Sequence, residues 1–267
     1  MIEKIQLVPL PHKQSLQWQK KYLASLSRPM DGMWFQISQS AQFWKIRVDR
    51  REIGYFCVDS SNILLQFYIV PEYLIRADFI FGFLADKRRF TAALVSTGDS
   101  LVLSASLELT QKIEVNAYLF SELNRNEIPL INQASYQVKK ASEKDFNKAA
   151  FFYTSSIGTP LEWTRQYTEK IIYKKGLYFF ENNEETIGIG EFRCSEHQRP
   201  YVDLGVIIAK EHRGKKHGAS IIAWLRGLAH KEGKVPICSC EKNNLASLNT
   251  LVGAGFIPSH KLFKVSF

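Results

Sequence analysis

Apolar and polar residues alternate along residues 136–267 in a pattern that predicts strands and helices in turn. Short apolar runs bounded by turn residues are typical of strands. They occur at 136–140, 177–181, 186–193, 201–209, 235–240 and 262–267. Ser142, followed by acidic residues, is typical of a helix start. Further helices are predicted at 162–174, at 244–252, and along the apolar stripe formed by Ile221, Ile222, Leu225, Leu228 and Ala229.

The first half has a similar order of elements, more loosely. Strands are predicted at 43–48, 52–58, 63–70, 90–96 and 113–120, with helices opened by Pro71 and at 99–107. Three strands, a helix, a strand, a helix and a strand therefore occur twice. The polar segment Ser121–Pro129 separates the halves, and we place the domain boundary near residue 130. The pattern predicts an α/β protein of two related domains, 1–130 and 131–267.

Composition limits the class of protein. The chain has 267 residues, 45% hydrophobic and 23% charged, which is typical of folded domains rather than disordered chains. No apolar run approaches the roughly 18 residues of a membrane span, and the first residues do not resemble a secretion signal. We therefore expect a cytoplasmic protein with no membrane partner. The four cysteines lack the spacing of a zinc site, so no metal is expected.

The positive charge is concentrated in the second half. Lys and Arg exceed Asp and Glu by 35 minus 26, a net charge of +9. Residues 136–267 alone hold 20 basic and 13 acidic residues, a net +7. Such an excess suits an anionic ligand, either a phosphorylated cofactor or a nucleic acid, and does not choose between them.

One segment has the pattern of a phosphate site. In Leu204–Ser220 a strand leads into a basic turn that contains glycine and then directly into a helix. Free backbone N–H groups and the positive end of the helix dipole meet at such a turn. Arg213, Lys215 and Lys216 add mobile positive charge there. The spacing fits neither a Walker loop nor the dinucleotide fingerprint. An ordinary basic turn with a glycine cap remains an alternative.

The same residues resemble a known family. Arg213-Gly-Lys-Lys-His-Gly-Ala219 is similar to the R-x-x-G-x-G/A loop of the GNAT acetyltransferases, which holds the pyrophosphate of acetyl-coenzyme A (acetyl-CoA). Asn244–Phe256 resembles the last conserved block of that superfamily. The resemblance covers about residues 136–267. It implies a fold of two GNAT-like domains, each a mixed, mostly antiparallel twisted sheet flanked by helices.

The resemblance also assigns the cofactor residues. Val206, Ile207 and Ile208 would pair with the pantetheine arm of acetyl-CoA, and Asn244 and Ser247 would line its pantetheine and adenosine side. The pyrophosphate would be held by the loop residues Arg213, Gly214, Lys215, Lys216, His217, Gly218 and Ala219.

Two positions depart from the family pattern. Lys216 stands where the family usually has its first loop glycine. Leu251 stands where many members have the tyrosine that protonates the leaving thiolate. Tyr201, His217 or His260 would have to replace that acid, and the sequence selects none of them.

The implied reaction is attack of an amine on a thioester, which needs a carboxylate to remove a proton from the amine. Asp203, just before the loop, and Glu191, on the preceding strand, are the candidates. The alternatives are an ion-paired strand-end carboxylate for Asp203 and a solvent-facing residue for Glu191. A backbone N–H near Ile207 would stabilise the developing oxyanion.

The first domain is expected to be a degenerate copy. Its corresponding junction, Val70–Asp78, has no glycine, and Glu72 would repel a pyrophosphate. We expect it to bind no cofactor and to pack against the second domain or shape the acceptor pocket.

The resemblance implies an N-acetyltransferase that uses acetyl-CoA and acts on a small molecule or protein with a primary amine, as a monomer or homodimer. A non-catalytic CoA-binding or protein-interaction module is the alternative. An RNA-associated protein is a third hypothesis. A phosphorylated cofactor explains the charge better than RNA does, because the basic residues surround one turn instead of forming an extended stripe with aromatic residues.

Overall fold

The computed structural model describes residues 4–123 and 136–267, and these form two compact units. Unit 1 contains residues 1–119 and 260–267, and unit 2 contains residues 120–259. The predicted boundary at residue 130 lies outside the described residues. No helix among the described residues is long and apolar enough to cross a membrane.

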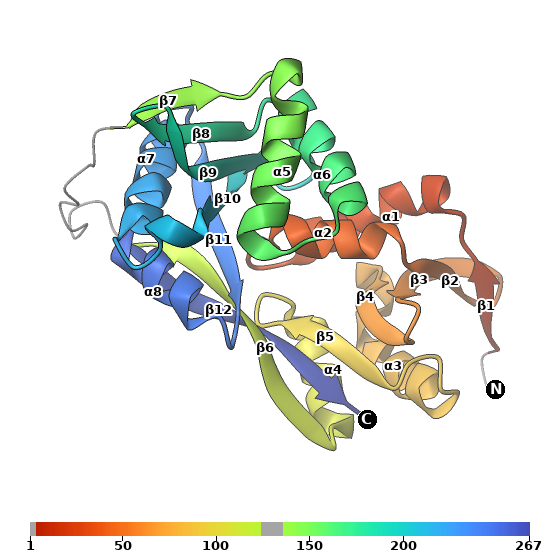
Figure 1. The fold of residues 1–267 in the computed structure, drawn as a ribbon. Coiled ribbons are helices and arrows are strands. Elements are labelled where there is room, and N and C mark those ends of the chain that lie inside the picture. Colours follow the sequence, from red (N-terminus) through yellow and green to blue (C-terminus); the bar gives the residue numbers. More distant parts are fainter. Residues whose placement is uncertain (1–3, 124–135) are drawn as a thin grey trace. The chain divides into compact units, whose positions relative to one another are not determined.

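Unit 2 has a mixed sheet with helices between its strands (Figure 1). Strands β7, β8, β9 and β10 are antiparallel neighbours, and β10 pairs in parallel with β11. The elements are β7 (Gln137–Lys140), α5 (Phe146–Ile157), α6 (Leu161–Tyr173), β8 (Leu177–Asn182), β9 (Glu185–Cys194), β10 (Tyr201–Ile208), a short 3-10 helix η4 (Lys210–His212), α7 (His217–Lys231), β11 (Val235–Glu241) and α8 (Leu245–Gly253). Apart from η4, each of these strands and helices was predicted to within a few residues, so the α/β prediction is confirmed.

Unit 1 repeats that order. Strands β1 to β4 are antiparallel neighbours, and β4 pairs in parallel with β5. Its elements are β1 (Ile5–Pro9), α1 (His12–Ser25), α2 (Gly32–Gln39), β2 (Gln42–Val48), β3 (Arg51–Val58), β4 (Ile63–Ile69), η1 (Pro71–Arg76), α3 (Ala77–Asp86), β5 (Ala92–Ser96) and α4 (Ser100–Leu109). The sequence pattern gave no prediction for residues 1–42. In the structure, β1, α1 and α2 lie in this segment and complete the repeat.

Two long strands supply residues to both units. Strand β6 (Lys112–Glu122) and strand β12 (Phe256–Ser266) each cross from one unit to the other. The C-terminal part of β12 pairs antiparallel with β5, with Leu262 opposite Ser96 and Ser266 opposite Ala92. The last residues of the chain are thus part of the sheet of unit 1. The apolar run at 262–267 predicted a strand here, but it did not predict that β5 would be its partner.

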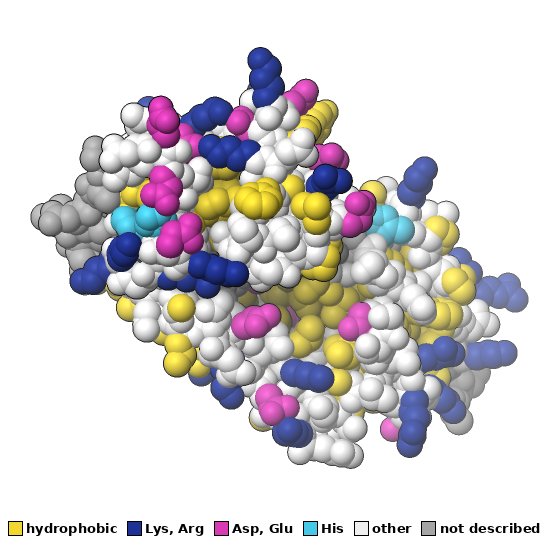
Figure 2. All heavy atoms as spheres, in the orientation of Figure 1, with side chains coloured by type: hydrophobic (Ala, Val, Ile, Leu, Met, Phe, Trp, Pro, Cys, Tyr) yellow, Lys and Arg dark blue, Asp and Glu magenta, His cyan; other side chains and the backbone are white. Residues whose placement is uncertain are grey.

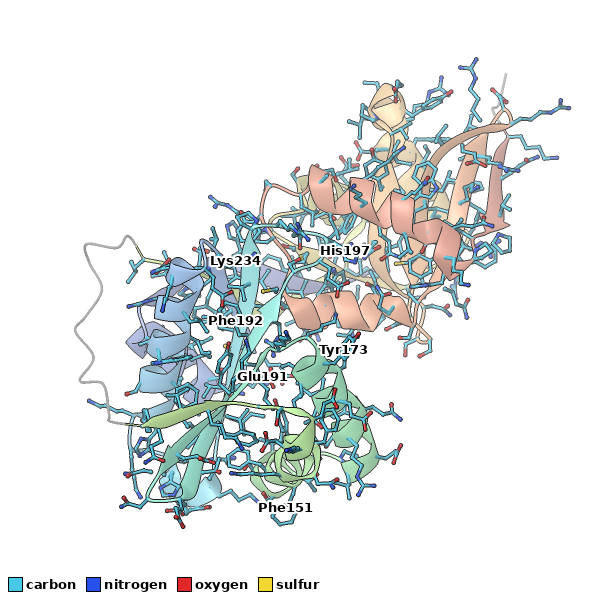
Figure 3. All side chains as sticks on the ribbon, turned by 90° about the horizontal axis from the view of Figure 1, so that it is seen from above. Phe151, Tyr173, Glu191, Phe192, His197 and Lys234 are labelled. Atoms are coloured by element: carbon cyan, nitrogen blue, oxygen red, sulfur yellow. The ribbon has the colours of Figure 1, made fainter. Side chains whose placement is uncertain are left out.

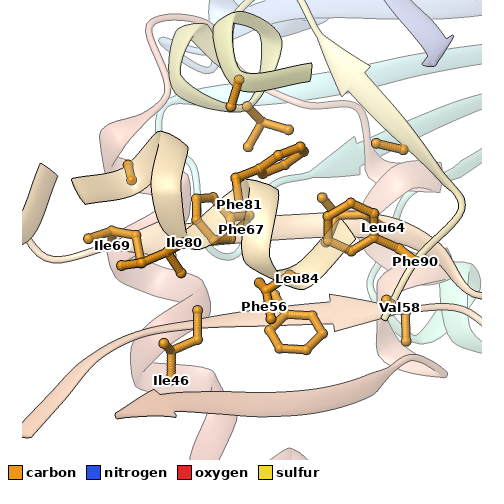
Figure 4. Close-up of a cluster of buried hydrophobic side chains, with 14 of the residues drawn as sticks. Ile46, Phe56, Val58, Leu64, Phe67, Ile69, Ile80, Phe81, Leu84 and Phe90 are labelled. Carbon is orange, nitrogen blue, oxygen red and sulfur yellow. The ribbon is translucent and has the colours of Figure 1, made fainter. Parts of the chain in front are cut away.

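Each unit has its own hydrophobic core. In unit 1, Phe67, Phe81 and Phe90 pack together with ring centroids 5.4 and 5.1 Å apart (Figure 4). In unit 2, Phe179, Ile189 and other fully buried side chains of β8 and β9 pack against α5 and α6. These cores hold the strands that carry the candidate site.

The predicted helix start at Ser142 is confirmed in detail. Ser142 and Asp145 form a capping box, and Lys139 lies 2.7 Å from the Asp145 carboxylate. Burial acts to raise the pKa of Asp145, but hydrogen bonds from Lys139 and Ser142 outweigh it and hold that pKa at about 2. Gly158, at φ +74°, then ends α5 in the left-handed conformation.

Candidate functional site

Strands β10 and β11 separate soon after they begin. Their parallel register runs from Tyr201 opposite Val235 to Asp203 opposite Ile237. Strand β10 continues to Ile208, still paired on its other edge with β9. In this described part of the sheet, one edge of β10 therefore has no register partner on β11. A free strand edge of this kind can bind an extended ligand through backbone hydrogen bonds.

The residues predicted to contact pantetheine lie on this separated stretch. Val206, Ile207 and Ile208 are all half-buried. The distance from Leu204 to Ile208 along the strand is about 13 Å at the usual rise per residue. This stretch of strand edge ends at the predicted loop.

The loop leads into an uncapped helix. Gly214 has φ +76° and Lys216 has φ +64°, so the chain turns twice through the left-handed region before α7. Lys216 occupies the N-cap position, and no side chain of the described residues caps the helix. The first N–H groups of the fifteen-residue helix α7 therefore remain available, and the helix dipole places positive charge there. Lys215 and Lys216 are exposed beside them.

Arg213 is held by backbone contacts, and its binding to the pyrophosphate stays a prediction. Its guanidinium donates hydrogen bonds to the backbone carbonyls of Ile208, at 3.2 Å, and Ser156, at 2.6 Å. It ties the end of β10 to α5. The prediction of a mobile charge was therefore wrong for Arg213, because two carbonyl acceptors that the sequence does not reveal fix its side chain.

Gly218 is explained by packing between helices. A Cβ atom at this position would lie 2.9 Å from Cγ2 of Thr250 on α8, which is closer than real contacts allow. The glycine allows α7 to approach α8. A contact of Gly218 with the pyrophosphate stays a prediction.

Asn244 and Ser247 form a helix cap. The Asn244 side chain accepts a hydrogen bond from the Ser247 backbone N–H at 3.0 Å and so caps α8. Burial raises the pKa of the neighbouring Cys240 thiol, which also has a hydrogen bond with Ser247. Leu251, further along α8, is buried. A contact of Asn244 and Ser247 with the cofactor stays a prediction.

Histidines and charged residues surround the start of α7 (Figure 2). His217 Nδ1 lies 2.7 Å from the Tyr136 hydroxyl. Burial, together with His212 and Lys215, lowers the pKa of His217. His212 Nε2 lies 2.9 Å from a carboxylate oxygen of Glu185. These contacts fix His217 at the rim of the loop.

The two candidate carboxylates lie in one buried cluster. The exposed fractions of Glu191 and Asp203 are 4% and 3%. Arg193 forms ion pairs with both of them. Tyr153 of α5 and Tyr167 of α6 donate their hydroxyl protons to the two oxygens of Glu191, with Tyr167 at 2.8 Å. Figure 3 shows Glu191 inside unit 2, whereas the labelled Phe151 lies on the outer side of α5.

This arrangement bears on the structural alternatives that the sequence left open for Glu191 and Asp203. Glu191 is not solvent-facing, so that alternative is wrong. Asp203 is ion-paired with a basic neighbour, which was its alternative. Whether either group acts in catalysis stays a prediction. Burial acts to lower the pKa of Arg193. Asp203 and Tyr167 raise that pKa by more than burial lowers it, so the guanidinium remains charged.

Gly205 makes room for this cluster. It lies opposite Glu191 in the β9–β10 register. A Cβ on Gly205 would lie 2.9 Å from both Arg193 Nη1 and Glu191 Oε2. Gly205 also belongs to the stretch of β10 that has left β11, so the cluster lies where the two strands part.

Sequence reasoning did not identify Arg193, Tyr153 and Tyr167. A signal existed for Arg193, because it is two residues from Glu191 on one strand and therefore on the same face. The tyrosines come from separate helices and had no such signal. Tyr201 begins β10, where its carbonyl accepts a hydrogen bond from the Ser195 N–H at 3.0 Å. Its catalytic role stays a prediction.

The fold agrees with that of known proteins. The sequence model of an acetyltransferase (GNAT) domain family matches residues 12–123, in unit 1. The structure of a GNAT-family acetyltransferase from Colwellia psychrerythraea is similar over 99% of both chains, with 26% identity and a TM-score of 0.91. Among curated proteins no match is found.

Two further structures share the fold at lower identity. A tandem GNAT protein from the clavulanic acid biosynthesis pathway covers 98% of both chains, with 14% identity and a TM-score of 0.62. A GCN5-related N-acetyltransferase from Sphaerobacter thermophilus covers 98% of this chain and 95% of its own, with 9% identity and a TM-score of 0.64. Residues 12–123 thus match the GNAT acetyltransferase domain family, and the chain has the fold of GNAT-family acetyltransferases over nearly its whole length. The resemblance seen in the second half thus extends to the first.

Proposed function

We propose that the protein is an N-acetyltransferase that binds acetyl-CoA in unit 2 and transfers the acetyl group to a primary amine. One observation carries the proposal. The free edge of β10 begins beside the buried cluster at Asp203 and ends near the uncapped start of α7. A ligand with a reactive end, an extended amide arm and an anionic head fits that order.

The residues present fit such a ligand. The N–H groups of His217, Gly218 and Ala219 would bind the pyrophosphate, with Lys215 and Lys216 supplying positive charge. The backbone of Val206–Ile208 would hold the pantetheine arm as a strand partner. Bound acetyl-CoA supplies an activated acetyl group for attack by nitrogen. A backbone N–H near Ile207 would stabilise the carbonyl oxygen during that attack.

Proton removal from the amine would fall to Glu191. It is the carboxylate that receives hydrogen bonds from both helices on that side of the sheet. Asp203 instead holds Arg193 through Nε and Nη2 of the guanidinium. We assign Asp203 a positioning role and Glu191 the role of general base. Tyr201 remains the candidate acid for the leaving thiolate.

Unit 1 would bind no acetyl-CoA. Its junction between β4 and α3 is the 3-10 helix Pro71–Arg76, with Glu72 in its first turn. Proline there removes an N–H group, and the glutamate repels phosphate. The unit keeps the parallel β4–β5 pair and so resembles unit 2 in topology alone.

A non-catalytic CoA-binding module is the second candidate. The ion pairs that engage both Glu191 and Asp203 favour it, because each carboxylate already has a structural partner in Arg193.

Thermal unfolding with acetyl-CoA tests binding, with an oligonucleotide of similar charge as the control. A rise in melting temperature that grows with acetyl-CoA concentration, and is absent with the oligonucleotide, supports both candidates. No rise contradicts both. Formation of acetylated amine, followed by mass spectrometry, then separates them. Mass detection is preferable to a thiol dye, because Cys194 is an exposed free cysteine.

A further inference from the structure

We propose that the hydroxyl of Tyr167 takes a proton from the acceptor amine and passes its own proton to Glu191. This inference rests on the proposed N-acetyltransferase function. It gives a role to a residue that the family motifs in this sequence do not identify.

The position of the Tyr167 hydroxyl carries the inference. It donates to Glu191 Oε2 at 2.8 Å and accepts from Arg193 Nη1 at 3.2 Å. One phenol oxygen therefore contacts both the base and the cation that positions it. Tyr153 contacts Glu191 as well, through the other carboxylate oxygen.

The charge of the cluster gives the proton a destination. Glu191 and Asp203 bring two negative charges, and Arg193 brings one positive charge. Uptake of one proton makes the formal charge of this buried cluster zero, which removes an uncompensated charge from the interior.

The remaining titratable groups around the cluster hold their protons. Burial raises the pKa values of Tyr153 on α5, Tyr167 on α6 and the thiol of Cys238 on β11. A carboxylate is therefore where the transferred proton rests.

Access to the cluster favours Tyr167 as the point of contact. Glu191 and Tyr153 are 4% and 2% exposed. Tyr167 is 8% exposed, and the side chain of Arg193 is 17% exposed. Trp163, which is 44% exposed, stacks on the Tyr167 ring with centroids 5.1 Å apart. On the proposed route, the amine approaches beside Trp163 and meets the Tyr167 hydroxyl first.

The proton transfer balances without another reactant. An N–H bond of the protonated amine breaks, and an O–H bond forms on Tyr167. The original O–H bond of Tyr167 breaks, and one forms on Glu191. The nitrogen keeps the electron pair that it needs for attack. After the product leaves, Glu191 returns the proton to water through the same hydroxyl.

The matched variants Tyr167→Phe and Tyr153→Phe test the relay, because each removes one hydroxyl from Glu191 and keeps its ring. The acceptor probe is whichever of n-butylamine, 2-phenylethylamine and glycinamide the wild type acetylates fastest. We expect Tyr167→Phe to lower kcat at pH 7 on the order of 10²-fold. The loss should shrink as the pH approaches 10, where the amine arrives neutral. Tyr153→Phe should lose less than about tenfold, equally at every pH.

A binding measurement gives a readout apart from activity. Calorimetric titration of the same amine, without acetyl-CoA, should show affinity on the order of tenfold weaker in Tyr167→Phe and little changed in Tyr153→Phe. If Tyr167→Phe does not fold, 3-fluorotyrosine at position 167 keeps the hydroxyl, lowers its pKa and should move the pH profile of kcat to lower pH.

Several results would overturn the inference. These are equal losses in the two variants with one shared pH profile, near-normal kcat in Tyr167→Phe, or an unmoved profile with 3-fluorotyrosine. Failure of the proposed function looks different. In that case the wild type itself acetylates none of the amines although it binds acetyl-CoA, and the relay falls with it.

Discussion

The guanidinium of Arg193 donates two hydrogen bonds to a single oxygen of Asp203, from Nε at 3.2 Å and from Nη2 at 2.9 Å. Both side chains are largely buried, so this pair fixes the orientation of Arg193 toward Glu191 and Tyr167. The carboxylate that precedes the loop in the sequence is thus a support for the cluster.

Asp203→Asn should therefore act on stability first. We expect the free energy of unfolding to fall by about 1–3 kcal/mol, because hydrogen bonds to a charged group are lost in the interior. Turnover should fall by the same factor at every pH. Urea unfolding and a pH series of kcat measure the two effects. Unchanged stability, with a turnover loss rescued at high pH, would instead make Asp203 the general base.

Gly218→Ala should destabilise unit 2 through Thr250. The added Cβ would lie 2.9 Å from Thr250 Cγ2, and a β-branched side chain has little freedom to move away. A cost of about 1–3 kcal/mol is expected. In a Thr250→Ala background most of that cost should disappear. A double-mutant cycle by urea unfolding measures this coupling. If the two changes are simply additive, the packing account of Gly218 is wrong.

Lys216→Gly should stabilise the protein. Lys216 has φ +64°, a conformation that costs a side chain free energy and costs glycine nothing. We expect a gain of about 0.5–1 kcal/mol in thermal or urea unfolding. Lys215→Gly is the matched control, because Lys215 is not in the left-handed region and glycine there should destabilise slightly. Equal effects at the two positions would contradict this reading of the loop.

Asp99 should make the stability of unit 1 depend on pH. Burial raises its pKa to about 6, although the Val102 N–H and the Tyr22 hydroxyl act against that rise. The folded protein therefore holds a proton between about pH 4 and 6 that the unfolded chain has lost, so stability falls as the pH rises through that range.

Asp99→Asn keeps a side chain that can cap α4, where the Asp99 carboxylate now accepts from the Val102 N–H at 3.1 Å. The variant should lose that pH dependence. Its free energy of unfolding, relative to that of the wild type, should therefore rise by roughly 2 kcal/mol as the pH increases from 4 to 7. Urea unfolding of both proteins at four pH values measures the difference. A difference that does not change with pH would show that Asp99 has an ordinary pKa.

The elements of unit 2 could be predicted from local pattern, because strands and helices there have clear periodicity and turn residues. Residues 1–42 gave no such prediction, and α1 shows why. It begins after Pro11 with no side-chain cap and buries polar residues such as Ser15 and Gln19. An apolar stripe of the usual kind is therefore weak in this helix.

The loop could be placed from sequence, while the contacts of its residues could not. The strand, turn and helix at 204–220 follow from glycine spacing and charge. The tie from Arg213 to Ser156 spans 57 positions of chain, and no local rule reveals it. The same holds for the cluster around Glu191, which joins two helices and two strands of the sheet.

Calorimetric titration of acetyl-CoA into the whole protein tests the central claim most directly. We expect one acetyl-CoA site per chain. The affinity should be at least about tenfold weaker in a Lys215→Glu, Lys216→Glu double variant, because two charges beside the start of α7 are reversed. The control, Lys144→Glu with Lys170→Glu, makes the same charge change on exposed residues of unit 2 away from the loop and should bind within about twofold of the wild type. No binding, two sites per chain, or equal weakening in the two double variants would contradict the account.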